Sequence, residues 1–109
     1  MTIQSIRAKN NEIMADYQDR MVALLQKAIA ANGNGQATGE LSDKDALFMV
    51  ELTHIQRVYE ANPDTSLIQA KLAFVADDYA TDFSPEEFMK AMMTAIQFWG
   101  AWKPVDLAA

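Results

Sequence analysis

The chain has 109 residues, half of them apolar, and its 15 acidic and 9 basic side chains give a formal net charge of −6. This apolar content exceeds that of disordered chains, and the length suits one domain, residues 1–109, with a single core. The absence of cysteine excludes disulfides and thiolate chemistry, and the negative charge argues against direct nucleic-acid binding.

The first predicted element is one long amphipathic helix over residues 3–31. This segment contains no proline or glycine, and apolar residues recur in it at spacings of three and four. At 1.5 Å per residue the helix spans roughly 43 Å, whereas a compact domain of this length is about 35 Å across. We therefore expect one end of the helix to project beyond its own fold and to require a partner.

The N-terminal half of this helix has the spacing of a coiled-coil seam. An asparagine in such a seam pairs with its counterpart in a second chain and fixes the register. Two interpretations stay open: residues 3–17 bind a second copy of the chain, or residues 1–10 are a frayed terminus. The candidate interaction residues are Ile3, Ile6, Asn10, Ile13 and Tyr17.

Glycines and asparagines interrupt the helical pattern after residue 31. Residues 32–41 contain three glycines and two Asn-Gly pairs, which predict a flexible loop. The helical pattern then resumes, and Asn62-Pro63 is expected to end the second helix. Further helices are therefore predicted over residues 43–61 and 64–81.

The last helix has the sharpest start signal in the chain. Ser84 is placed to cap it, Pro85 takes the first helical position, and Glu87 completes a capping box. The sequence thus predicts an all-α fold, a small antiparallel bundle of about four helices with an extended N-terminal helix. This last helix is predicted over residues 85–101, followed by a tail over 102–109.

The single histidine lies in a Glu-x-x-His step formed by Glu51 and His54. Ferritin-like di-iron bundles use this step twice, so a complete site here requires a two-fold dimer. At 100° per residue, Glu51 lies at the margin of the apolar face and His54 lies further towards solvent. A histidine with a local hydrogen bond is the other interpretation.

Acidic residues are dense around the corner between the third and fourth predicted helices. Their spacing does not resemble a calcium-binding loop. They form either a solvated corner or a landing site for a basic protein partner. The residues are Asp77, Asp78, Asp82, Glu86 and Glu87.

The fourth predicted helix is apolar over a wide arc, because methionines and aromatic residues surround it. Phe98 and Trp99 are neighbours about 100° apart, so both are buried only if two surfaces are covered. Phe98 and Trp102 are therefore candidate contacts for another protein. The alternative is an ordinary core helix with the C-terminal tail folded over it.

Taken together, these patterns predict a non-enzymatic protein–protein interaction module, such as an adaptor, chaperone, inhibitor or structural subunit. Self-association through the N-terminal helix is its expected first interaction. We expect no cofactor, because the chain lacks nucleotide-binding glycine motifs. We expect no enzymatic activity, because it lacks the motif of a catalytic triad. A dimeric metal-binding bundle and an acidic mimic that blocks a nucleic-acid-binding protein are the alternatives.

The expected localisation rests on two targeting signals that the sequence does not show. The N-terminus does not have the charge and apolar pattern of a signal peptide. No apolar run approaches the roughly 20 residues of a membrane span. We therefore expect a cytoplasmic protein that does not bind membranes, with secretion without a cleaved signal left open.

Overall fold

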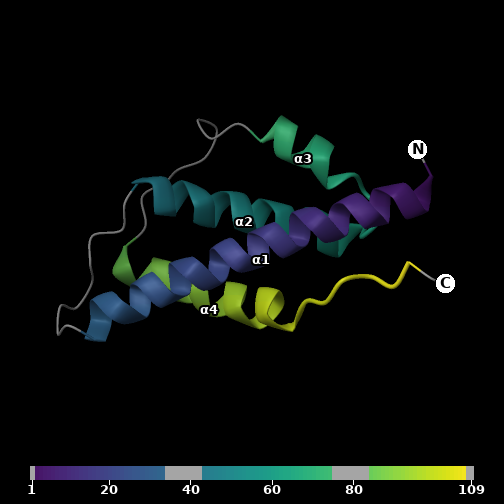
Figure 1. The fold of residues 1–109 in the computed structure, drawn as a ribbon. Coiled ribbons are helices and arrows are strands. Elements are labelled where there is room, and N and C mark those ends of the chain that lie inside the picture. The colour runs from purple at the N-terminus through teal and green to yellow at the C-terminus, as the bar shows by residue number, and fades with distance from the viewer. Residues whose placement is uncertain (1, 34–42, 75–83, 108–109) are drawn as a thin grey trace.

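The computed structural model describes residues 2–33, 43–74 and 84–107. These residues form four α-helices and no strand, which confirms the all-α prediction. The helices pack into a small bundle in which α1 lies across α2 and α4 (Figure 1). Their bounds are α1 Ile3–Gly33, α2 Asp43–Ala61, α3 Leu67–Ala73 and α4 Pro85–Ala101.

The bundle is elongated along its longest helix. Its principal extents are 50 × 29 × 17 Å, and its radius of gyration is 15.1 Å. The 31 residues of α1 span about 46 Å at 1.5 Å per residue, so the helix fits along the long axis. The prediction that α1 projects past its own fold rested on a roughly spherical domain about 35 Å across, and that assumed shape was wrong.

The bounds of α2 and α4 agree with the sequence prediction. Ser84 Oγ accepts a hydrogen bond from the Glu87 N–H at 3.1 Å, and Pro85 occupies the first turn. This bond satisfies one of the N–H groups that have no partner inside the helix. The local signals in the sequence were therefore sufficient to place the start of α4.

The third helix is shorter than predicted and starts later. Asp64 N–H donates to Asn62 Oδ1, and Thr65 N–H donates to the Asn62 carbonyl, so these residues form a turn instead of a helix. The helix begins at Leu67 and ends at Ala73. Phe74 then takes an extended conformation with φ −70° and ψ 119°. The remainder of the predicted helix, residues 75–81, lies outside the described residues.

The core is centred on aromatic and methionine side chains from α1, α2 and α4. The Tyr17 ring lies 5.9 Å from the Trp99 ring and 6.3 Å from the Phe48 ring, measured between centroids. On α4 the buried stripe includes Ala95, whereas the neighbouring Ile96 is 37% exposed. The largest fully buried side chains are Trp99, Tyr17, Met14, Met21, Met49, Leu52, Ile55, Leu67 and Met92.

Candidate functional site

The predicted coiled-coil seam is largely covered by the chain itself. Asn10, Ile13 and Tyr17 are 3%, 8% and 0% exposed. The hypothesis that they face a second chain is therefore corrected: they pack into their own core, because α2, α3 and α4 lie along α1. Only Ile3, which is 56% exposed, and the half-buried Ile6 remain partly open.

Asn10 bonds to the turn between α2 and α3, where a partner asparagine was expected. Its Nδ2 donates to the carbonyls of Pro63 (3.1 Å) and Thr65 (2.7 Å). Its Oδ1 accepts the Leu67 N–H at 3.0 Å. The buried amide therefore fixes the fold of one chain, and the predicted pairing with a second asparagine is not what buries it.

Glu51, the carboxylate of the Glu-x-x-His step, accepts a hydrogen bond from a side chain of the core. Tyr17 Oη donates to Glu51 Oε1 at 2.7 Å. Burial, followed by this bond to a carboxylate, raises the pKa of Tyr17 well above its ordinary value. A hydroxyl that keeps its proton remains a hydrogen-bond donor to Glu51.

His54 lies against Phe74, with 5.7 Å between the ring centroids. Within residues 2–33, 43–74 and 84–107, no group of three His, Asp or Glu side chains gathers around a possible metal position. The metal-binding alternative therefore gains no support from the described residues and remains a hypothesis.

The acidic corner is only partly described. Glu86 and Glu87 are exposed in the first turn of α4. Their negative charges are stabilised there by the positive end of the helix dipole. Asp77, Asp78 and Asp82 lie outside the described residues.

The aromatic residues near the end of α4 are covered by the chain itself. Phe98 is half-buried and packs edge-on against Tyr59 of α2, with 6.3 Å between the centroids. Trp102 is 9% exposed. The prediction that Phe98 and Trp102 contact another protein is thus corrected. The alternative holds, a core helix with its tail folded over the bundle.

Two amide side chains of α1 hold this end of the chain. Gln18 Nε2 donates to the carbonyls of Trp99 (2.6 Å) and Trp102 (3.2 Å). Asn11 bonds to both the N–H and the carbonyl of Val105. The sequence analysis missed both amides, because a polar residue on a helix gives no sign of a partner more than 80 residues away.

A different part of α4 is apolar and exposed. Met89, Met93 and Ile96 follow one another at spacings of four and three and are 43%, 59% and 37% exposed. They lie about 160–220° around the helix from Phe98, at 100° per residue. Because Phe98 packs on α2, these three side chains lie on the side of α4 away from α2.

The adjoining stripe of α1 is also apolar and exposed. Val22 and Ile29 are 40% and 61% exposed, and Val22 follows Gln18 by one helical turn. Since Gln18 contacts the end of α4 and the two helices lie side by side (Figure 1), this stripe borders α4. We call Val22, Ile29, Met89, Met93 and Ile96 together the uncharged face.

Four of the five residues of this face fall where the sequence is nearly free of charge, whereas Met89 lies beside Lys90 and one helical turn after Glu86. Residues 91–102 contain no Asp, Glu, Lys or Arg, and Met21–Gly33 contains only Lys27. Lys27 bonds to Asp45 of α2 at 2.6 Å, on a different side of α1. Charged residues are depleted at the centres of protein interfaces, and methionine is enriched there.

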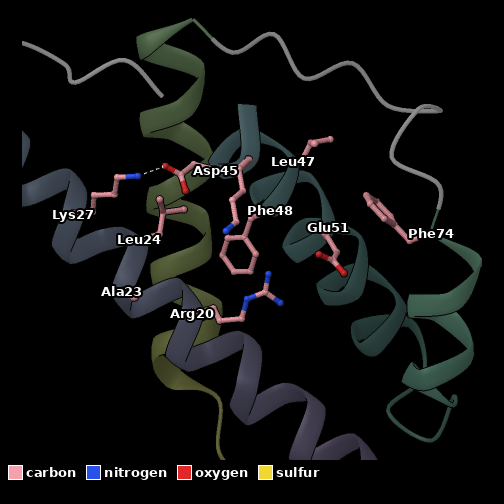
Figure 2. Close-up of a pocket in the computed structure, with 10 residues that line it drawn as sticks. Arg20, Ala23, Leu24, Lys27, Asp45, Leu47, Phe48, Glu51 and Phe74 are labelled. Carbon is pink, nitrogen blue, oxygen red and sulfur yellow. Dashed lines mark hydrogen bonds and ion pairs between the residues drawn. The ribbon is translucent and has the colours of Figure 1, made fainter. Parts of the chain in front are cut away.

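A second feature is a cleft of about 640 Å³ between α1 and α2 (Figure 2). The side chain of Phe48 lies within it, and Phe74 lies at one edge. Arg20 extends across the cleft, with its guanidinium carbon 4.5 Å from the centre of the Phe48 ring. The charged lining residues are Arg20, Lys27, Lys44, Asp45 and Glu51, and the apolar ones are Ala23, Leu24, Leu47, Phe48 and Phe74.

The cleft has the opposite charge to the protein. Three cations and two carboxylates line it, which gives 3 − 2 = +1, whereas the chain as a whole carries −6. The sequence analysis did not find the cleft, because its residues come from separate helices and form no motif.

None of the described helices combines the length and the apolar character needed to cross a lipid bilayer. Comparison of the chain with protein-family models, with curated proteins and with solved structures finds no match in any of the three.

Proposed function

We propose that the protein is a non-enzymatic protein–protein interaction module that self-associates through the uncharged face. The observation that supports this most directly is the exposure of five large apolar side chains on two adjacent helices, four of them in segments that contain almost no charged residue. Exposed apolar patches rimmed by polar residues mark interaction sites in soluble proteins. Methionine adds adaptability, because its flexible side chain fits several packing partners.

The charge of the chain supports a second copy as the partner. Two chains of net charge −6 repel each other over most of their surfaces. In a two-fold dimer the same patch meets itself, so a charge near the axis lies close to its own counterpart. A face that carries few charged side chains reduces this repulsion and requires few complementary ion pairs.

The interface proposed here differs from the one that the sequence predicted. It lies on the outer side of α1 and α4 and not at residues 3–17. The N-terminal seam is occupied by the chain's own core from Asn10 onward, whereas the five residues of the uncharged face are 37–61% exposed. Self-association therefore does not require α1 to detach from the bundle.

Charge substitution within the face tests the proposal. Met93 is 59% exposed, so Met93→Glu and Met93→Lys should leave the fold intact. Both variants should lower the mass in sedimentation velocity relative to the wild type, because each buries an unpaired charge on association. Using both signs separates burial of charge from the change in net charge.

Leu72 provides the matched control. It is 80% exposed on α3, outside the uncharged face, so Leu72→Glu and Leu72→Lys should keep the wild-type mass. A wild-type mass in both Met93 variants, or an equal loss in the Leu72 variants, would refute the proposed interface.

A further inference from the structure

We propose that the cleft between α1 and α2 binds a small organic anion, with the apolar body of the ligand against Phe48 and Phe74 and its oxyanion on Arg20 and Lys44. This inference is independent of self-association, because the cleft and the uncharged face share no residue. Its volume of about 640 Å³ lies within the range of pockets that enclose small ligands.

The distribution of charge in the cleft selects the sign of the ligand. Lys27 is neutralised by Asp45 at 2.6 Å. Of the two carboxylates, Asp45 is therefore paired, and Glu51 accepts the hydrogen bond from Tyr17 Oη. The two remaining cations, Arg20 and Lys44, outnumber the one remaining carboxylate, Glu51, so the lining keeps a net charge of 2 − 1 = +1 in an acidic protein.

Neither remaining cation is fully neutralised. Arg20 approaches Asp16 only to 3.8 Å, and both side chains are about half exposed, so the pair is weak. Lys44 is exposed and makes no ion pair with the residues that the structure describes. Both cations therefore retain N–H groups for an incoming oxyanion.

Arg20 is also held in a defined position. Its guanidinium group lies over the rings of Phe48 (4.5 Å) and Tyr17 (5.5 Å), which restricts the side chain by cation–π contact. A planar guanidinium offers paired N–H groups that match the oxygens of a carboxylate or phosphate. An ordered arginine beside an apolar wall suits a ligand with both an anionic and an apolar part.

Titration with 2-naphthoate, followed by two-dimensional NMR of the wild-type protein, tests the proposal. A ligand of this size should bind with a dissociation constant of about 1 mM and shift the amide signals of Arg20, Lys44 and Phe48. The uncharged analogue 2-naphthamide should bind about tenfold more weakly or not at all. Equal binding of the two, or shifts confined to other residues, would overturn the proposal.

The same titration with 2-naphthyl phosphate distinguishes the two kinds of oxyanion. Tighter binding than that of naphthoate would identify phosphate monoesters as the ligand class. Weaker binding would identify carboxylates. Either result supports the anion site, provided that the same amide signals shift.

Two variants of equal net charge separate the site from general electrostatics. Lys44→Gln and Lys90→Gln both change the net charge from −6 to about −7, but only Lys44 lines the cleft. Lys44→Gln should weaken naphthoate binding about fivefold, and Lys90→Gln should leave it unchanged. Equal effects of the two variants would show that the anion responds only to overall charge.

Arg20 is tested with a conservative pair. Arg20→Gln should weaken binding about tenfold, whereas Arg20→Lys, which keeps the charge, should recover part of it. Circular dichroism of each variant establishes that the helices are intact. Met93→Lys should bind naphthoate as the wild type does, which keeps this test separate from that of self-association.

Discussion

The side-chain amide of Asn11 pairs with the backbone of Val105 as a neighbouring strand would. Asn11 Nδ2 donates to the Val105 carbonyl at 3.0 Å, and Val105 N–H donates to Asn11 Oδ1 at 2.8 Å. These reciprocal bonds fix the segment around Val105 beside the N-terminal half of α1, so the segment that follows α4 and the start of α1 lie at the same end of the bundle (Figure 1).

Removing the Asn11 amide should release this segment. Asn11→Ala deletes both hydrogen bonds and should lower the free energy of unfolding by about 1–2 kcal/mol. Urea denaturation measures the loss, and hydrogen exchange should show faster exchange of the Val105 amide. Gln4→Ala, at an exposed position of the same helix, is the control and should change stability by less than about 0.5 kcal/mol.

Asn10 should be among the most sensitive polar positions in the chain. Asn10→Ala removes three bonds at a site that is 3% exposed and leaves backbone groups of the α2–α3 turn without partners. We expect a loss of about 3 kcal/mol in urea denaturation. A loss below about 0.5 kcal/mol would show that the turn does not depend on this side chain.

The burial of Tyr17, together with its bond to Glu51, predicts a stability loss at alkaline pH. The folded chain raises the pKa of Tyr17, so the unfolded state loses this proton first, at its ordinary pKa of about 10. The contribution is therefore complete below about pH 10 and falls as the pH rises further, by up to about 1.4 kcal/mol per pH unit.

Urea denaturation at about pH 9 and 11 measures this dependence. Tyr17→Phe removes the titrating hydroxyl, so its stability should change less between the two pH values than that of the wild type. If the variant and the wild type lose the same free energy, the alkaline sensitivity arises from other groups.

Because part of the predicted seam packs into the chain's own core, replacing isoleucine by aspartate should affect stability differently at its buried and exposed positions. Ile13 is 8% exposed, whereas Ile3 is 56% exposed. Ile13→Asp buries a carboxylate in the core and should destabilise the fold by more than about 3 kcal/mol, whereas Ile3→Asp should cost less than about 0.5 kcal/mol. Thermal unfolding followed by circular dichroism compares them, and a stable Ile13→Asp protein would contradict the observed packing.

The elements that the sequence predicted well are those with local start and stop signals. Ser84 and Pro85 mark the beginning of α4, and Asn62-Pro63 follows the end of α2. The start of α3 has no such signal, since Ser66 makes no side-chain cap bond. The Leu67 N–H is instead satisfied by Asn10, 57 positions earlier, and helical periodicity does not reveal a contact of that range.

The candidate sites were less predictable than the fold. An apolar pattern identified the seam from Ile3 to Tyr17 but not which molecule covers it. Exposure of Ile96 and burial of Ala95 depend on how α4 is rotated against α1 and α2. The same is true of the cleft, which exists only because Arg20 and Phe48 come together from different helices.

The solution mass of the wild-type protein over a range of concentrations, measured by light scattering, tests self-association most directly. Self-association predicts a mass that rises with concentration towards twice the 12.1 kDa of the chain. A mass of one chain at every concentration would contradict it.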